Sequence, residues 1–371
     1  MSARKYWLGF NQVAGVGPLR LAALRDYFSS LEEAWLAPDR ELRQAGLDRR
    51  TIQNLHGARQ SLDLGDLLRQ LDEIGASALT LDDLDYPSVL KELPDAPPVL
   101  YMRGTLTTED DWAVAIVGTR KASTYGRDMA YQLAGDLARE GITVVSGLAL
   151  GIDAAAHRGA LEAGGRTIAA LPCGIDRTYP PEHRALARQI AQQGALVTEF
   201  PPGTNAVAKN FPPRNRIISG LSLGIVVVEA PIKSGALLTA DYAAEQGREV
   251  FAVPGQSTSA SSRGSNTLIQ EGAKLVMSVD DVLSELNLTR SAVETRTEVR
   301  KIAPENREEA LILQNLGDEP RHIDDLCRIC ELPVAVISST LAIMELKGLV
   351  RQIGSMQYTL AVGTGTPYVL D

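Results

Sequence analysis

The sequence predicts an α/β protein with a doubly wound parallel sheet, flanked by a small N-terminal helical domain and a C-terminal winged helix. Three observations predict this fold. Short β-branched runs alternate with helical stretches through residues 81–286, residues 1–80 carry apolar side chains at helical spacing, and residues 307–371 combine three helical patterns with a small hairpin.

The central alternation indicates which kind of sheet to expect. Strands are expected at 113–118, 142–147, 167–172, 195–199, 224–229 and 249–254. Helices are expected between most of them, at 127–140, 154–163, 182–193 and 237–246. Repeated βα units with nearly continuous apolar strands indicate a Rossmann-like parallel sheet that is covered on both faces. Ligands of such sheets bind beyond the carboxyl ends of the strands.

The flanking segments divide the chain further. In the helical domain, Val13-Ala-Gly-Val-Gly-Pro-Leu-Arg20 has the form of a helix-hairpin-helix turn, in which glycines let backbone N–H groups face a phosphate and Pro18 begins the next helix. The alternative is a turn that only packs two helices together. A proline-punctuated connector follows at 86–104, and the polar segment 287–306 reads as a linker to the winged helix.

Length, charge and cysteine content exclude several classes of protein. The 371 residues suffice for two or three domains, and only three cysteines occur, which favours a reducing compartment, so we expect a cytoplasmic protein. No signal peptide and no apolar run of about 18 residues is recognisable, so we expect neither export nor a membrane partner. Because the formal net charge is −9, any nucleic-acid site must be local; segments 112–127 and 200–228 contain basic residues and no acidic ones.

Three strand-to-helix loops carry candidate phosphate ligands. Such loops present backbone N–H groups and the positive end of a helix dipole. The candidates are Gly118, Arg120 and Ser123 after the first expected strand, Ser146, Gly147 and Gly151 after the second, and Lys233, Ser234 and Gly235 after the fifth. The alternative for each loop is a plain tight turn. None fits Gly-x-Gly-x-x-Gly or Gly-x4-Gly-Lys-Ser/Thr, so we expect no dinucleotide, no P-loop nucleotide and no cofactor.

The segment 209–219 is the strongest candidate for binding. Its prolines are expected to keep it extended and out of a helix. It carries Lys209, Phe211, Arg214, Asn215 and Arg216. Cations for phosphates and an aromatic ring for bases are what a strand of unpaired nucleotides requires, so we predict that this edge of the sheet binds single-stranded DNA. The alternative is a solvated basic loop with Phe211 in the core.

Patterns for catalysis and metal binding are weak. His157 is a lone histidine in an alanine-rich helical stretch, which is typical of a packing residue. Cys327 and Cys330 lie at helical spacing beside leucines, without a second cysteine pair, which is typical of a buried apolar face. We therefore expect no catalytic residue, no metal site and no enzymatic activity.

Ordered motifs run through residues 86–286. They include Ile116-Val-Gly-Thr-Arg120, Val144-Val-Ser-Gly-Leu-Ala149, Phe211-Pro-Pro-Arg-Asn-Arg216 and Ser234-Gly-Ala-Leu-Leu-Thr-Ala240. In these motifs the chain resembles the DprA/Smf family, the DNA-processing proteins of bacterial transformation. It departs from the family at Leu150, where a basic residue is expected.

The resemblance implies more than the residues alone indicate. It implies binding and nuclease protection of incoming single-stranded DNA, a homodimer formed through the Rossmann-like domain, and loading of a RecA-type recombinase. The DNA-contacting residues that carry over are Arg120, Lys209, Arg214 and Lys233, with Phe211 as a stacking partner.

Two other functions are compatible with parts of the sequence. An enzyme of the nucleotide-phosphoribohydrolase kind would use a glutamate near a phosphate loop, as Glu229 stands before Lys233. A winged-helix transcription factor would read duplex DNA. However, residues 308–371 hold nine acidic against four basic residues, and the helix expected at 334–346 has no Lys or Arg, so we expect the winged helix to contact protein or to cap the chain.

Overall fold

The structure is a computed structural model and describes residues 3–288, 307–316, 321–330, 332–346, 350–352 and 356–360. The chain divides into two compact units, Met1–Leu286 and Asn287–Asp371. The linker expected at 287–306 lies, from residue 289 on, outside the described residues.

A single nine-stranded sheet forms the centre of the first unit, with strands in the order β1-β2-β6-β5-β4-β3-β7-β8-β9. The strands are β1 (Ser77–Thr80), β2 (Val99–Gly104), β3 (Ala113–Val117), β4 (Thr143–Ser146), β5 (Thr167–Ala170), β6 (Ala195–Thr198), β7 (Gly224–Val227), β8 (Glu249–Ala252) and β9 (Lys274–Leu275). All pairs from β6 to β9 are parallel, and the prediction of a doubly wound parallel sheet is confirmed. The six expected strands are β3 to β8.

The connector expected at 86–104 is only partly irregular. Its last residues form β2, which pairs antiparallel with both β1 and β6 and extends the parallel sheet at one edge. The prolines before Val99 mask this strand in the sequence, but Val99, Leu100 and Tyr101 are fully buried. The Tyr101 hydroxyl donates a hydrogen bond to Asn11 Oδ1 at 2.9 Å, which ties the sheet to the N-terminal helices.

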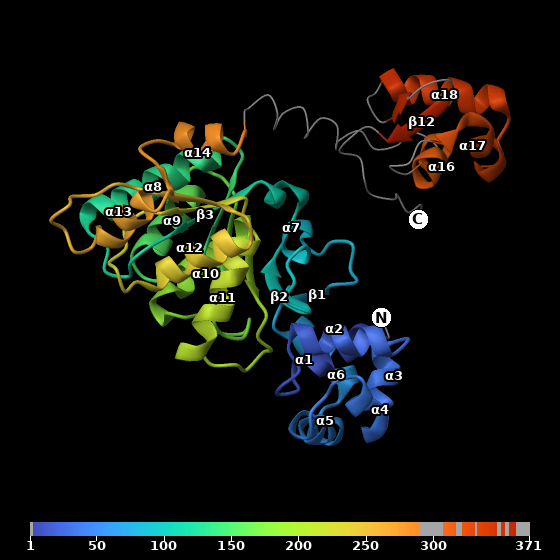
Figure 1. The fold of residues 1–371 in the computed structure, drawn as a ribbon, viewed down its shortest axis with the longest axis horizontal. Helices are drawn as coiled ribbons and strands as arrows, with labels where there is room; N and C mark the ends of the chain where they lie inside the picture. The colour runs from blue at the N-terminus through green and yellow to red at the C-terminus, as the bar shows by residue number, and fades with distance from the viewer. Residues whose placement is uncertain are drawn as a thin grey trace. The chain divides into compact units, whose positions relative to one another are not determined.

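Helices cover both faces of the sheet, as Figure 1 shows. Helices α8 (Thr124–Arg139), α9 (Ile152–Glu162) and α10 (Arg184–Gln193) pack side by side on one face, and α7 (Ser88–Lys91), α11 (Phe211–Gly220) and α12 (Gly235–Glu245) on the other. Helices α13 (Arg263–Gln270) and α14 (Val279–Glu285) complete the unit.

The first six helices are gathered into one bundle, drawn in blue in Figure 1. They are α1 (Arg4–Asn11), α2 (Pro18–Tyr27), α3 (Leu31–Leu36), α4 (Asp39–Gln44), α5 (Arg49–Ser61) and α6 (Leu64–Glu73). Pro18 begins α2 as expected, and Gly15 adopts the left-handed φ of +97° that the turn requires. Arg20 donates to Gly15 O and Thr51 Oγ1, both at 2.7 Å, and pairs with Asp48. The cation of this turn is thus used inside the bundle, which favours the packing interpretation.

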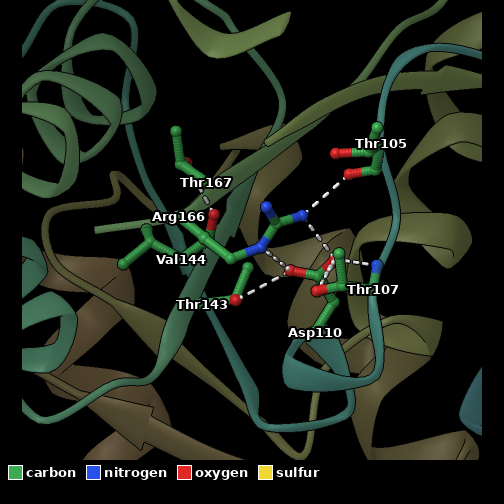
Figure 2. A network of polar contacts seen from close by, with 7 residues as sticks. All are labelled: Thr105, Thr107, Asp110, Thr143, Val144, Arg166 and Thr167. Atoms are coloured by element: carbon green, nitrogen blue, oxygen red, sulfur yellow. Dashed lines mark hydrogen bonds and ion pairs between the residues drawn. The ribbon is translucent and has the colours of Figure 1, made fainter. Parts of the chain in front are cut away.

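A polar network fastens the amino-terminal edge of the parallel strands (Figure 2). Asp110, 8% exposed, accepts hydrogen bonds from Arg166 Nε at 2.9 Å, from Thr143 Oγ1 at 2.9 Å and from the Thr107 backbone N–H at 2.8 Å. Arg166 Nη2 also donates to Thr105 O at 2.7 Å. These hydrogen bonds connect the segment between β2 and β3 to the first residues of β4 and β5.

The second unit has the elements of a winged helix. Helices α16 (Arg307–Asn315), α17 (Ile323–Cys330) and α18 (Val334–Leu346) accompany a three-stranded sheet of β10 (Arg321–His322), β12 (Gln357–Leu360) and β11 (Val350–Gln352). Cys330 lies in the core of this unit and Cys327 packs against it. In the described part of the chain no single helix could cross a membrane; by length and composition, only α17 and α18 taken together as a bent pair pass that test.

Candidate nucleic-acid interface

A hollow of about 300 Å³ opens where the direction of strand order reverses, between the carboxyl ends of β3 and β7. This is the place where open α/β sheets bind ligands. The loop after β3, the loop after β7 and the start of α11 line it. We call it the basic hollow; the predicted residues in its lining are Gly118, Arg120, Phe211, Arg214, Asn215, Lys233, Ser234 and Gly235.

An aromatic ring stands among the cations of the basic hollow. The guanidinium carbon of Arg120 lies 4.8 Å from the centre of the Phe211 ring, and that of Arg214 lies 5.7 Å from it. Phe211 is partly exposed, so the alternative that it belongs to the core is not supported. Arg120 and Lys233 are exposed, whereas Arg214 is 4% exposed. The hollow therefore offers two exposed cations, one buried cation and a ring.

Backbone carbonyls hold Arg214 in place. Its Nη1 donates to Gly147 O at 2.6 Å and to Ala170 O at 3.2 Å. Burial lowers the pKa of the guanidinium to about 10, partly offset by the nearby Asp153 carboxylate, so Arg214 remains charged at neutral pH. Asp153 Oδ2 in turn accepts hydrogen bonds from the N–H groups of Gly147 and Ala149. The buried cation thus lies near a buried carboxyl group, whose pKa is raised by burial and partly lowered again by Arg214.

The expectation that prolines keep the 209–219 segment extended is wrong. Residues Phe211–Gly220 form α11, and the prolines occupy its first turn. Proline is tolerated there because the N–H groups of the first turn have no helical partner. The helical start, and not an extended loop, is what directs Arg214 and Asn215 into the basic hollow while Ile217 enters the core.

The loop between β4 and α9 forms one wall in an unusual conformation. Leu148 adopts a left-handed φ of +57° and Gly151 one of +81°. The His183 ring nitrogen Nδ1 donates to Leu148 O at 2.8 Å and fixes this strained residue. A β-carbon at Gly151 would lie 2.3 Å from Thr119 O, so a side chain there would push against the loop that carries Arg120.

Several predicted residues support the basic hollow from outside its lining. Ser146 Oγ donates to Ile116 O inside the sheet, Gly147 supplies the carbonyl for Arg214, and Ser123 caps α8. Lys209 is exposed in the short helix Ala208–Asn210 and does not line the hollow. Leu150, the departure from the family pattern, is 45% exposed beside this wall.

Arg216 belongs to a different part of the structure. It is 6% exposed and pairs with Glu199 at 2.6 Å and with Asp95 at 3.1 Å. Because these carboxylates already compensate its charge, and because it does not line the hollow, the structure does not bring Arg216 together with the other predicted cations.

Comparison with known proteins identifies the family. The family model described as DNA recombination-mediator protein A matches residues 77–287, and the DprA winged helix domain model matches residues 296–354. Protein Smf of Synechocystis sp. is 37% identical over 392 residues, which cover 96% of this chain and 98% of the relative. The chain belongs to the DNA recombination-mediator protein A family.

Solved structures of this family show the same fold. DNA processing protein A from Streptococcus pneumoniae matches with a TM-score of 0.68 and 33% identity over 76% of this chain and 97% of that one. DNA processing protein A from Helicobacter pylori, solved to understand its single-stranded DNA binding mode, matches with a TM-score of 0.52 and 31% identity over 57% of this chain and 95% of that one.

Sequence reasoning missed two residues at or beside the basic hollow. Asp153 lines the basic hollow as the counter-charge of Arg214, and its place in the first turn of a helix after a glycine loop could have indicated this. Tyr179 sets the edge of its ring against Phe211, with centroids 5.7 Å apart and planes at 76°. No local pattern marks Tyr179, because it comes from the loop after β5.

Two residues considered for catalysis have other partners. His157 is fully buried, its Nδ1 hydrogen bonds with Thr167 Oγ1 at 2.7 Å, and burial lowers its pKa to about 3, as suits a packing residue. Glu229 does not line the basic hollow; its Oε2 accepts hydrogen bonds from the Ser123 N–H at 2.8 Å and from Ser123 Oγ at 3.1 Å.

Proposed function

We propose that the basic hollow binds single-stranded DNA, with phosphates on the cations and a base against the Phe211 ring. The observation that carries this proposal is that Arg120 and Arg214 lie against the Phe211 ring while Lys233 lines the same hollow, at the carboxyl edge of the parallel sheet. The one acid in the lining, Asp153, is engaged by backbone N–H groups and faces Arg214. The relative from Helicobacter pylori, which has a single-stranded DNA binding mode, supports the same ligand for this chain.

A single strand fits this arrangement better than a duplex. The ring can only receive a base whose faces and edges are free, whereas the bases of a duplex are already stacked and paired. The phosphoribohydrolase alternative needs the Glu229 carboxylate inside the hollow that binds the phosphate. Glu229 is 3% exposed and shares one oxygen with Ser123, outside the basic hollow. The geometry thus favours binding of a polymer over hydrolysis of a nucleotide.

Further parts of the proposed role come from the family. We infer that the bound strand is protected from nucleases and passed to a RecA-type recombinase, that two copies associate through the sheet domain, and that this happens in the cytoplasm. Nuclease digestion of the complex, recombinase filament assembly on coated strands, and sedimentation of the purified protein test these parts separately.

A binding titration across a salt series tests the main proposal. For single strands, the logarithm of the binding constant falls with the logarithm of salt concentration by about 0.7 per neutralised phosphate. Three cations in the hollow therefore predict a slope of about −2 from these contacts alone. Lys233→Ala and Arg120→Ala should each weaken binding and flatten the slope by about 0.7.

A matched control removes an equal charge elsewhere in the unit. Arg188 is exposed on α10 and does not line the basic hollow, so Arg188→Ala should change neither affinity nor slope. The proposal is wrong if duplex binds as tightly as single strand, or if Arg188→Ala has the same effect as Lys233→Ala.

A further inference from the structure

A second hollow lies beside the basic hollow, at the carboxyl ends of β7 and β8. Its volume is about 650 Å³, within the range of about 300–1,000 Å³ that small-ligand pockets span. We call it the outer hollow. Its lining includes Ser123, Tyr125, Glu229, Pro254 and Gly255, and none of its residues lines the basic hollow.

The lining of the outer hollow does not suit a phosphate. It contains no Lys or Arg, and its one charged group is the Glu229 carboxylate. Glu229 is 3% exposed, and Oε2 is saturated by the two hydrogen bonds from Ser123. Among the described residues Oε1 has no hydrogen-bond partner. Because Glu229 lines the outer hollow, we take Oε1 as the acceptor that a ligand there could use. A carboxylate oxygen accepts hydrogen bonds and does not donate them, so it selects a ligand that presents an N–H group.

An aromatic side chain stands next to this acceptor. Tyr125 is 51% exposed, and its hydroxyl donates to Pro254 O at 3.0 Å, which restrains the ring at the rim of the outer hollow. A restrained, half-exposed ring beside a hydrogen-bond acceptor is the combination that holds a nucleobase, because the base can pack on the ring and donate its amino group.

A strand in the basic hollow can reach the outer hollow. Arg120 and Ser123 are three residues apart in one loop, so their α-carbons are separated by at most about 11 Å. Stacked nucleotides advance about 3.4 Å each. The two hollows are therefore only a few nucleotides apart along one strand.

We propose that the outer hollow holds one nucleobase of the bound strand, and that Glu229 Oε1 accepts a hydrogen bond from the exocyclic amino group of that base. Cytosine, adenine and guanine carry this group, and thymine does not. The inference rests on the proposed binding of single-stranded DNA and adds a base preference to it. Phosphates still determine most of the affinity, and the outer hollow discriminates at one position.

Competition between two pyrimidine strands tests the inference. The wild-type protein should bind oligo(dC) about tenfold more tightly than oligo(dT) of equal length, because one charge-assisted hydrogen bond separates them. Pyrimidine strands are chosen because neither stacks strongly on itself. Equal affinity of the wild-type protein for the two strands would overturn the inference without any variant.

Exchange of the carboxylate for an amide gives a sharper result. In Glu229→Gln the side-chain carbonyl can still accept from Ser123, while the amide NH₂ takes the place of Oε1 and donates. This variant should reverse the preference, because thymine O4 is an acceptor and the cytosine amino group is a donor. An unchanged ratio of the two affinities in a folded Glu229→Gln protein would refute the role of Glu229.

Two further variants separate the ring from the acceptor. Tyr125→Ala should weaken both strands by a similar factor and leave their ratio unchanged. Tyr131→Phe is the control, because Tyr131 lies on the same helix and its hydroxyl bonds to Glu162, away from the outer hollow. This variant should change neither the affinity for either strand nor the ratio of the two affinities. If Tyr125→Ala has no effect on either strand, no base lies against this ring and the inference fails.

The outcomes distinguish the inference from the proposed function. Loss of the oligo(dC) preference with salt-dependent binding intact overturns only the outer hollow, whereas absence of single-strand binding overturns both. Free deoxycytidine, added as a competitor, should not displace oligo(dC), since it has no phosphates that the cations of the basic hollow could bind. Displacement at equal concentration would make the outer hollow a small-molecule site and would contradict a role in holding the strand.

Discussion

Replacement of Arg214 should damage the fold as well as the site, unlike replacement of Lys233. Arg214→Ala leaves the Asp153 carboxylate, 5% exposed, without its facing cation and removes both hydrogen bonds to Gly147 O and Ala170 O. Loss of a buried cation near a buried carboxyl group, together with its two hydrogen bonds, costs about 3–5 kcal/mol of unfolding free energy. Lys233 is exposed, and its replacement by alanine should change this free energy by less than about 0.5 kcal/mol.

Urea unfolding followed by circular dichroism measures this difference. At about 2 °C per kcal/mol for a unit of this size, Arg214→Ala should also lower the melting temperature by about 6–10 °C. Adding Asp153→Asn to Arg214→Ala should restore part of the loss, because the uncompensated charge is removed. Substitutions at surface positions change the free energy of unfolding by about 0.5 kcal/mol or less. If Arg214→Ala changes it by no more than this, the reasoning from burial is refuted.

Four other results are expected. Phe211→Ala should weaken single-strand binding by about 1–3 kcal/mol through lost stacking while the salt slope stays that of wild type; a filter-binding salt series checks both quantities. Asp110→Ala should destabilise the fold by about 3–5 kcal/mol, because it leaves the partly buried Arg166 guanidinium without its carboxylate partner. A variant that remains folded should still bind DNA normally. Because the pKa of His157 is lowered to about 3 in the folded protein, the unfolded state takes up a proton at higher pH than the folded state does. Up to about 5 kcal/mol of unfolding free energy is therefore present above pH 6.5 and is lost as the pH falls toward 3. In urea unfolding measured across this pH range, His157→Asn should remove that dependence. Deletion from Glu308 onward should leave single-strand affinity within a few-fold, since α18 has no Lys or Arg, and a tenfold loss in a folded protein would show that the winged helix binds DNA.

The sequence was informative where a local pattern determines the structure. The strands β3 to β8 are nearly continuous apolar runs, and the helices between them have the period that such units require, so the sheet and the edge that carries the site could be predicted. The loops around Arg120 and Lys233 follow from the same reasoning, because the carboxyl ends of neighbouring parallel strands must meet.

The errors arose where distant residues decide the outcome. Arg214 and Arg216 are two positions apart in one basic segment, yet the first lines the basic hollow and the second pairs with Glu199 and Asp95. Nothing in the segment itself separates them, because helical geometry points them in different directions and their partners lie elsewhere in the chain. The prolines of this segment misled for a related reason: the same residues suit an extended loop and a first helical turn.

The carbonyls that hold Arg214 also bear on how a strand would be seated. A free arginine side chain loses about 2 kcal/mol of rotamer entropy when it is ordered, whereas this one is already ordered by Gly147 O and Ala170 O before any ligand arrives. A guanidinium that cannot rotate can donate hydrogen bonds to a phosphate in only one orientation. Arg214 would therefore fix the position of one phosphate, so that oligonucleotides of different sequence bind in the same register relative to the protein. The exposed cations would then adapt to the DNA backbone on either side of this phosphate.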